Sequence, residues 1–165
     1  MIACDCSNSI QNNVASIKKQ CADLPVRVLW NNVGVNTGEA AALEEKLLPD
    51  LECIVNTNCL FTISLTSALI PIMKKQVTGE KSKAVIANVS SFLSVLPAAN
   101  YVPYSASKAF VNQFSSALHC ELEDSGILVS IVRPAPVATA MSVIREASLM
   151  VPLLDTWACL LYTSR

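Results

Sequence analysis

Short runs of apolar residues alternate with longer stretches of helical periodicity, and this alternation constrains the fold of the chain more than any other feature. The apolar runs cover residues 26–30, 84–89 and 127–132, and a shorter run begins the chain at residues 2–4. Runs that are apolar throughout are typical of strands buried in a parallel sheet. Strands that alternate with helices form β-α units. The sequence therefore predicts an α/β fold, with a Rossmann-like parallel sheet and helices on both of its faces.

The stretches between these runs predict the helices. Helical patterns cover residues 9–21, 39–48, 51–75 and 105–123. Ser7 or Asn8 is expected to cap the first of them. Gly126 is expected to end the last one in a left-handed conformation, because glycine adopts that conformation without a steric penalty.

Composition excludes several classes of function. The chain has 165 residues, of which 52% are hydrophobic and 15% charged, and its net charge is −1. This length suits one domain with a substantial core. Lys and Arg form no basic stripe, so no nucleic-acid partner is expected. Seven cysteines without C-x-x-C spacing favour free thiols in a reducing compartment, with no metal site.

Tyr104 and Lys108 lie four residues apart at the start of the expected helix, so their side chains project from one helical face. When a hydride reaches a carbonyl group, the resulting alkoxide needs a proton. A phenol can supply it if its pKa falls from about 10 toward neutrality. A neighbouring ammonium lowers a phenol pKa in this way. The pair predicts an apparatus for carbonyl reduction, with Tyr104 as the proton donor.

Ser91 follows the apolar run at residues 84–89. A hydroxyl at the carboxyl end of a parallel strand faces the crevice in which α/β proteins bind ligands. There Ser91 could hydrogen-bond a substrate oxygen and stabilise its developing charge. A plain loop or helix-capping role for Ser90-Ser91 stays open.

Taken together, these residues resemble the short-chain dehydrogenases/reductases over roughly residues 4–141. Tyr104-x-x-x-Lys108 is similar to the catalytic pair of that family, and Ser91 stands thirteen residues before Tyr104, at the family's usual spacing. Asn31-Asn32-Val33-Gly34 resembles the family's N-N-x-G motif. Asn58 lies thirteen residues before Pro71, where the family places an asparagine that holds a water of the proton relay. Asn56 is the nearest competitor for that role.

The resemblance also implies cofactor-binding residues. Asp5 resembles the aspartate that hydrogen-bonds the adenine ring, and Tyr104 and Lys108 would contact the nicotinamide ribose. Residues 134–139 resemble the P-G-x-V-x-T segment under the nicotinamide, with Ala135 in place of glycine. The implied cofactor-binding set is Asp5, Asn31, Asn32, Gly34, Tyr104, Lys108, Pro134, Val137 and Thr139.

Finer motifs resemble one branch of the family, which contains 17β-hydroxysteroid dehydrogenases and very-long-chain 3-oxoacyl-CoA reductases. The branch motifs are Asn-Asn-Val-Gly at 31–34 and the stretches at residues 110–115, 118–122 and 137–142. This branch implies NADP(H) in preference to NAD(H) and a lipophilic substrate, a steroid or a 3-oxoacyl-CoA. It also implies a homodimer and an endoplasmic reticulum membrane location for the intact parent. The chain itself shows no signal peptide and no expected membrane span, because polar residues interrupt residues 60–73. By itself it is therefore expected to be soluble on the cytosolic side.

The family's glycine-rich phosphate-binding turn has no counterpart among the four glycines of this chain, Gly34, Gly38, Gly79 and Gly126. We therefore expect a sheet that lacks the first two strands of the family fold, in a chain truncated at both ends. Residues 1–150 would form a partial dehydrogenase domain, and residues 151–165 an atypical tail that need not be native. In this form the chain is expected to be inactive.

The sequence thus predicts an oxidoreductase that transfers a hydride between NADP(H) and a ketone or secondary alcohol. Tyr104, Lys108, Ser91 and Asn58 form its catalytic set. One alternative is a catalytically inert, truncated family member that acts in protein interaction. Another is a sugar-nucleotide epimerase, which shares the Tyr-x-x-x-Lys pair but fits the Ser91 spacing less well. His119, the only histidine, is expected at a surface or interface.

Overall fold

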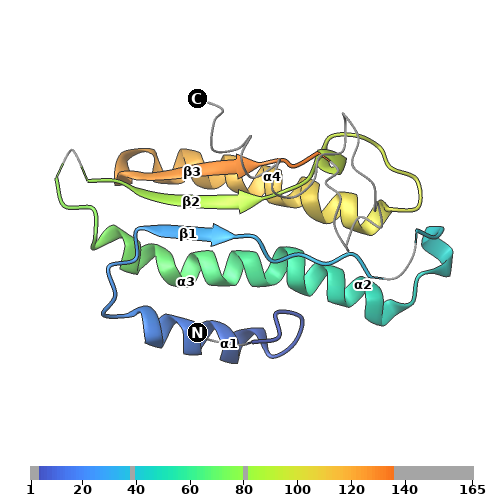
Figure 1. The fold of residues 1–165 in the computed structure, drawn as a ribbon, viewed down its shortest axis with the longest axis horizontal. Helices are drawn as coiled ribbons and strands as arrows, with labels where there is room; N and C mark the ends of the chain where they lie inside the picture. The colour runs from blue at the N-terminus through green and yellow to red at the C-terminus, as the bar shows by residue number, and fades with distance from the viewer. Residues whose placement is uncertain (1–3, 38–39, 80–81, 136–165) are drawn as a thin grey trace. The chain divides into compact units, whose positions relative to one another are not determined.

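Three parallel strands in the order β1-β2-β3 form the sheet (Figure 1). In this computed structural model, which describes residues 4–37, 40–79 and 82–135, they are β1 (Val28–Asn31), β2 (Ala84–Val89) and β3 (Ile127–Val132). Asn31 pairs with Asn88, and Val89 pairs with Val132, so the carboxyl ends of the strands meet at one edge. The predicted parallel sheet is confirmed, and the last two strands have the predicted bounds.

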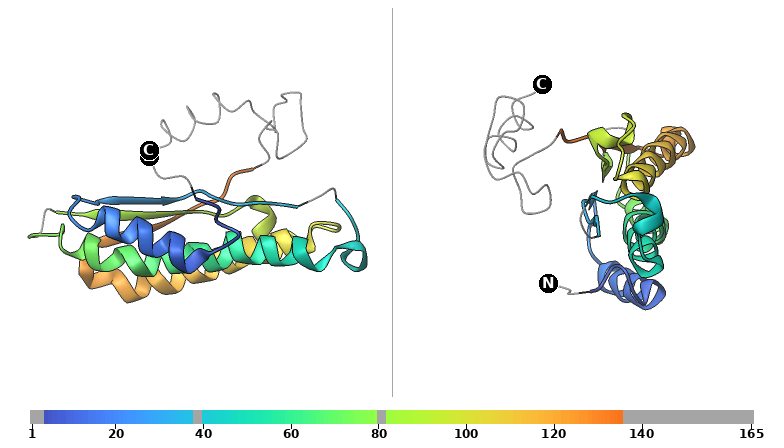
Figure 2. Two further views of the ribbon diagram at one scale, coloured as in Figure 1. Left: turned by 90° about the horizontal axis from the view of Figure 1, so that it is seen from below. Right: turned by 90° about the vertical axis from the view of Figure 1, so that its right-hand side faces the viewer.

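The α-helices of the described residues lie on one face of this sheet (Figure 2). They are α1 (Ile10–Cys21), α2 (Leu48–Val55), α3 (Thr62–Lys74) and α4 (Val102–Leu122). The buried apolar core lies between α3, α4 and the strands, and it consists of Leu29, Leu69, Ile72, Met73, Ala84, Ile86, Leu118, Leu122 and Ile127. On the other face, Val28, Trp30 and Leu128 are half exposed or more. A second layer of helices stays a prediction.

Several helix ends differ from the predicted ones. Ser9, with a left-handed φ of 49°, precedes α1 and makes no side-chain capping bond. The hydroxyl of Ser7 and the amide of Asn8 bond Asp5 instead, so neither is the predicted cap. The helix predicted at residues 39–48 is reduced to one 3-10 turn, η1 (Leu43–Glu45), because the backbone is extended at Lys46 and Leu47.

Helix α4 begins three residues before the predicted start at residue 105 and ends within one residue of the predicted end. Pro103 lies in its first turn, where the missing N–H costs no helical hydrogen bond. The helix continues into the 3-10 turn η4 (Glu123–Ser125), and Gly126 follows with φ 73°, the left-handed conformation predicted for it. One 3-10 turn, η3 (Phe92–Ser94), lies in the loop before α4. It follows Ser91, whose hydroxyl accepts a hydrogen bond from the Leu93 amide.

The long helix predicted at residues 51–75 has a change of geometry in its middle. Helix α2 passes into a π-helical segment, η2 (Asn56–Phe61), and then into α3. Such π segments are frequent at functional sites, since they insert a residue into an otherwise regular helix. Within η2, the side chains of Thr57 and Asn58 are buried. The insertion therefore brings polar groups into the interior, near the carboxyl edge of the sheet.

Among the described residues, the stretch Leu48–Lys74 is the one helix long and apolar enough to cross a membrane. Its 27 residues contain a window of mean hydropathy 1.6, of which 39% is buried in the fold. The sequence predicted no membrane span because polar residues interrupt residues 60–73. The stretch found in the structure is longer, since it begins at Leu48. A helix buried in a protein core can have the same length and composition as a membrane span. Phe61, Leu69 and Met73 of this stretch are buried, as expected for a core helix.

Candidate active site

Lys108 is an almost fully buried cation at the carboxyl edge of the sheet. Only 4% of the residue is exposed, and its Nζ donates a hydrogen bond of 2.9 Å to the carbonyl of Val89, the last residue of β2. Burial lowers the pKa of Lys108 to about 8, and the Cys59 thiol partly opposes this effect. No described carboxylate contributes to this pKa. Two of the three ammonium donors are left for a ligand.

Asn58, from the π segment, joins the loop after β1 to helix α4. Its Oδ1 accepts a hydrogen bond of 2.8 Å from the Val35 amide. Its Nδ2 donates to the Val35 carbonyl at 2.9 Å and to the Ser107 hydroxyl at 2.9 Å. Both side-chain N–H donors of Asn58 are therefore used within the protein, and any water that this residue holds must bind to its remaining acceptors.

Gly34 allows this loop to approach Lys108. A Cβ at position 34 would lie 2.9 Å from the Lys108 Nζ and 3.4 Å from the Asn58 Oδ1. Real Cβ atoms essentially never come closer than 3.0 Å to another heavy atom. A side chain at position 34 would therefore require the loop or the end of the flexible Lys108 side chain to shift. The φ of Gly34 is not among the positive ones, so close approach is the reason that favours glycine here.

Tyr104 and Ser91 complete the group. The Lys108 Nζ lies 5.8 Å from the centroid of the Tyr104 ring. Burial raises the pKa of Tyr104, and a side-chain hydrogen bond with Ser91 partly opposes that rise. The predicted fall of this pKa is therefore wrong for the protein without a ligand: burial outweighs the other influences, and Lys108 is not among them. Ser91, Tyr104, Lys108 and Asn58 are nevertheless brought to one edge of the sheet.

Two further serines anchor the first turns of α4; the sequence left Ser90 a loop or capping role and predicted none for Ser107. Ser90, which is buried, donates from Oγ to the Lys108 carbonyl at 2.9 Å. Ser107 donates from Oγ to the Tyr104 carbonyl at 2.7 Å while it accepts from Asn58. Each serine directly precedes a candidate catalytic residue in the sequence, and this position is the signal that could have indicated them. Ser107 also lies in a helix, where serine commonly bonds nearby backbone carbonyls.

Asn31 is turned away from the edge and into the interior. Its Nδ2 donates to the Thr66 hydroxyl at 2.9 Å and to the Asn88 Oδ1 at 2.7 Å. Asn88 in turn donates to the Ser115 hydroxyl at 2.8 Å. These four residues are all buried and connect α3, β1, β2 and α4. The side-chain donors of Asn31 thus hold elements together, although the sequence suggested Asn31 for cofactor binding.

The other predicted cofactor residues lie apart from this group or outside the described part. The Asp5 carboxylate accepts hydrogen bonds from Ser7 and Asn8, which lower its pKa to about 2. Asn32 is exposed, and Asn56 bonds the Ser7 carbonyl, away from Lys108. Pro134 belongs to the second unit of the chain, residues 133–165. Val137 and Thr139 lie outside the described residues, as does the domain boundary predicted at residue 150.

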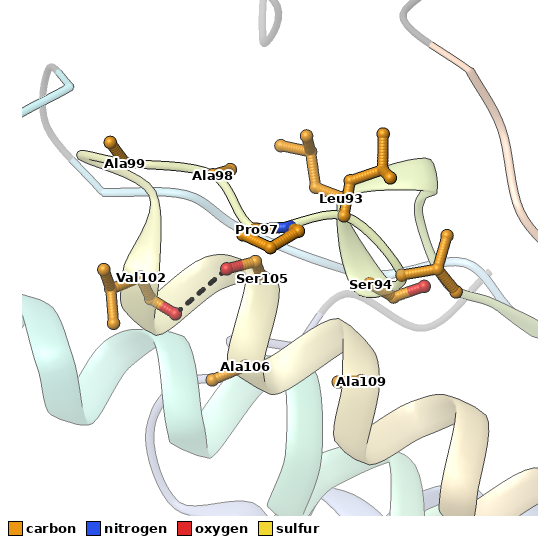
Figure 3. Close-up of a pocket in the computed structure, with 11 residues that line it drawn as sticks. Leu93, Ser94, Pro97, Ala98, Ala99, Val102, Ser105, Ala106 and Ala109 are labelled. Carbon is orange, nitrogen blue, oxygen red and sulfur yellow. Dashed lines mark hydrogen bonds between the residues drawn. The ribbon is translucent and has the colours of Figure 1, made fainter.

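An apolar hollow of about 500 Å³ lies between the loop after β2 and α4 (Figure 3). Leu93, Pro97, Val102, Ala106 and Ala109 line it, and Ser105 contributes a hydroxyl that bonds the Val102 carbonyl. Successive helical residues are about 100° apart, so Ala106 projects about 200° away from Tyr104. This hollow therefore lies on a different side of α4 from Tyr104.

The chain matches the family model described as short chain dehydrogenase over residues 1–148. Among curated proteins it is similar to the very-long-chain 3-oxoacyl-CoA reductases of Scheffersomyces stipitis and Debaryomyces hansenii. The first is 34% identical over 154 residues, which is 92% of this chain and 44% of that protein. The second is 36% identical over 154 residues, with the same coverage of 92% and 44%. The chain thus spans less than half the length of these relatives.

Solved structures share the fold. A short-chain dehydrogenase from Sphingobium yanoikuyae in complex with NADPH superposes with a TM-score of 0.80 at 23% identity, over 96% of this chain and 60% of that one. A bulky-bulky ketone specific alcohol dehydrogenase from Comamonas testosteroni gives a TM-score of 0.76 at 22% identity, over 98% and 61%. At these identities the likeness concerns the fold alone.

Proposed function

Because the chain belongs to the short-chain dehydrogenase family, we propose that the protein it represents reduces the ketone of a 3-oxoacyl thioester with a nicotinamide cofactor. The observation that carries the proposal is the buried ammonium of Lys108 beside Tyr104. Within the described part of the chain, no carboxylate affects the pKa of this ammonium. The relatives named very-long-chain 3-oxoacyl-CoA reductase favour the thioester over the steroid. For NADP(H) over NAD(H), the support is the resemblance to the branch through its motifs at residues 31–34 and 137–142.

The residues at the carboxyl edge fit the nicotinamide-ribose end of such a cofactor. Lys108 retains two donors that suit the hydroxyls of a ribose. When bound, the reduced nicotinamide supplies the hydride for the carbonyl carbon. The fit concerns that end alone, since the four glycines of the chain form no phosphate-binding turn.

In this proposal, Tyr104 delivers the proton. The phenol is protonated at neutral pH, which is the form that a reduction requires, although its raised pKa makes it a weaker proton donor than a free tyrosine. Ser91 donates a hydrogen bond to the substrate oxygen and stabilises the charge that develops there. Lys108 stabilises the phenolate that remains after proton transfer, because an ammonium nearby favours the charged form. Asn58 supports the path by which Tyr104 regains its proton.

We also propose a homodimer in the intact protein. Val55 of α2 and Val102 and Phe110 of α4 are apolar and at least 38% exposed. An apolar groove of about 360 Å³ runs between these helices. Exposed apolar patches of this kind mark protein contacts, and most soluble oligomers are symmetric copies of one chain. The endoplasmic reticulum location of the longer protein stays a prediction from the resemblance.

An assay of NADPH oxidation tests the function. The 165-residue chain is expressed by itself and in frame with the upstream part of its transcript, and each is mixed with a long-chain 3-oxoacyl-CoA. We expect turnover from the extended protein and none from the chain alone. Tyr104→Phe should lower kcat of the extended protein about 100-fold or more. Tyr101→Phe, which removes a neighbouring phenol, should change kcat less than about twofold.

Other outcomes assign other functions. If Tyr104→Phe leaves the rate of the extended protein unchanged, the catalytic proposal is wrong, and the inert family member in protein interaction becomes the better hypothesis. Parallel assays with NADH and with a steroid ketone determine cofactor and substrate preference. A higher kcat/KM for the steroid would reject the thioester.

A further inference from the structure

Ser107 occupies an unusual position between two candidate catalytic residues. It is 4% exposed, and its hydroxyl makes two hydrogen bonds, as donor to the Tyr104 carbonyl at 2.7 Å and as acceptor from the Asn58 Nδ2 at 2.9 Å. The side chain therefore connects η2 to the turn of α4 that carries Tyr104 and Lys108. A serine within a helix commonly bonds an earlier backbone carbonyl, so the bond from Asn58 is the one that joins two elements.

The contacts of Asn58 extend this connection to a third element. Asn58 also bonds the amide and the carbonyl of Val35, in the loop after β1. Gly34, the neighbour of Val35, lies against the Lys108 ammonium, with a Cβ position only 2.9 Å from Nζ. A shift of Asn58 would therefore move the loop that shields Lys108 from water.

A second serine on α4 provides an internal comparison. Ser115 is 1% exposed, accepts a hydrogen bond of 2.8 Å from the Asn88 Nδ2, and donates to the Val111 carbonyl. Ser107 and Ser115 thus make the same two kinds of bond, to an asparagine amide and to an earlier carbonyl of their own helix. They differ in location, since Ser115 lies two turns further along α4 and touches no candidate catalytic residue.

We propose that Ser107 is a positioning residue that holds Asn58, the Gly34-Val35 loop and the first turns of α4 in the arrangement required for proton transfer. The proposal rests on the proposed reductase function. Without the Ser107 hydroxyl, one buried N–H of Asn58 loses its partner, which favours a rearrangement that restores a hydrogen bond. Asn58 would then leave Val35 or tilt, and water would reach the ammonium of Lys108.

The test compares Ser107→Ala, Ser107→Thr and Ser115→Ala with the 165-residue chain, in which burial lowers the pKa of Lys108 to about 8. The Lys108 pKa is measured by NMR of ¹³C-labelled lysine, so no turnover is needed. Ser107→Ala should raise this pKa by about 1, toward its ordinary value, because the ammonium becomes hydrated. Ser107→Thr, which keeps the hydroxyl, and Ser115→Ala should leave it within about 0.3. In the described part of the chain, two titratable groups lie near Lys108, namely Tyr104 and Cys59, and both are present in all variants.

Thermal unfolding separates positioning from a purely structural role. Both alanine variants should lower Tm by a similar amount, about 2–8 °C, since each removes a buried hydroxyl. The proposal is supported if both alanine variants lose the same stability and only Ser107→Ala changes the pKa of Lys108. If Ser107→Ala does not fold, Ser107→Cys is measured, and a smaller rise of the pKa is expected. An unchanged Lys108 pKa in the folded variant, or an equal change in Ser115→Ala, overturns the proposal.

Measurements on the extended protein test the positioning role of Ser107 separately from the reductase function. There, Ser107→Ala should lower kcat about tenfold and leave KM for NADPH within about twofold, since Lys108 stays able to bind the ribose. If the extended wild-type protein oxidises no NADPH while Ser107→Ala still raises the Lys108 pKa, the proposed function fails and the positioning of Asn58 and Lys108 stands. Turnover with an unchanged kcat in Ser107→Ala rejects the positioning role alone.

Discussion

At the scale of single residues, Lys108 is the group with the largest influence on how this protein responds to pH. Its pKa of about 8 in the folded chain lies below the ordinary value of 10.5. Between these two values the unfolded chain binds a proton that the folded chain has lost. The free energy of unfolding therefore rises with pH across this window. The raised pKa of Tyr104 acts in the opposite direction, above about pH 10, where the unfolded chain loses its phenol proton first.

Replacement of Lys108 by methionine should remove this pH dependence. Between about pH 7.5 and about pH 9.5, wild type should gain about 2 kcal/mol of unfolding free energy relative to Lys108→Met. Urea unfolding at a series of pH values measures the difference. Lys83→Met, at an exposed position before β2, is the control and should run parallel to wild type. Parallel curves for Lys108→Met would show that the ammonium is not buried in solution.

Residue types and spacing were sufficient to predict part of the site. Tyr104 and Lys108 were predicted because a helix places residues four apart on one face. Ser107 was not predicted, because its role depends on Asn58, a residue from a distant helix. The use of Asn31 in the interior was also missed, since nothing in an N-N-x-G motif indicates which side of the strand end its first side chain occupies.

At the scale of secondary-structure elements, the network of Thr66, Asn31, Asn88 and Ser115 fixes the packing of two helices against two strands. Asn31 and Asn88 are paired residues of β1 and β2, and the amide of one bonds the other. A shift of register by one residue would separate these amides and leave buried polar groups without partners. The network therefore favours one register.

A double-mutant cycle tests this coupling. Asn31→Ala and Asn88→Ala should each cost about 2–4 kcal/mol, because each leaves a buried polar group unpaired and a small cavity. The double variant should cost about 1–2 kcal/mol less than the sum of the two, since the second substitution removes a group already unpaired. Urea unfolding supplies the values. Strict additivity would mean that the two amides do not interact.

The sequence predicted elements better than their irregularities. Mostly apolar runs marked β2 and β3 to the residue, although each strand carries one polar residue, Asn88 in β2 and Ser130 in β3. The π segment at Asn56–Phe61 was missed because no residue pattern distinguishes it from an α-helix. Tertiary hydrogen bonds of Asn58 to Val35 and Ser107 accompany it, and such contacts between distant segments are invisible in a local pattern.

At the scale of the whole molecule, the face of the sheet opposite the helices carries exposed apolar side chains in the described part of the chain. Trp30 is 53% exposed and Val28 is 62% exposed on β1, and Leu128 of β3 is 50% exposed. Exposed apolar side chains gathered on one sheet face favour association with other chains. The prediction of a sheet that lacks its first two strands agrees with this open edge at β1.

Substitution of Trp30 should therefore reduce self-association. We expect Trp30→Ser to lower the fraction of oligomer at a given concentration by about half or more, because it removes the largest apolar group of this face. Sedimentation velocity over a concentration series measures the fraction. Leu24→Ser is the matched control, since Leu24 is also 53% exposed but lies in the turn after α1. An equal effect of both substitutions would exclude a specific role for the sheet face.

The close approach of Gly34 to Lys108 links two motifs that are far apart in the chain. A methyl group at position 34 and the lysine ammonium would compete for the same volume, since they would lie 2.9 Å apart. A side chain at position 34 would require the loop or the Lys108 ammonium to shift, so substitutions at the two positions should not be independent of each other.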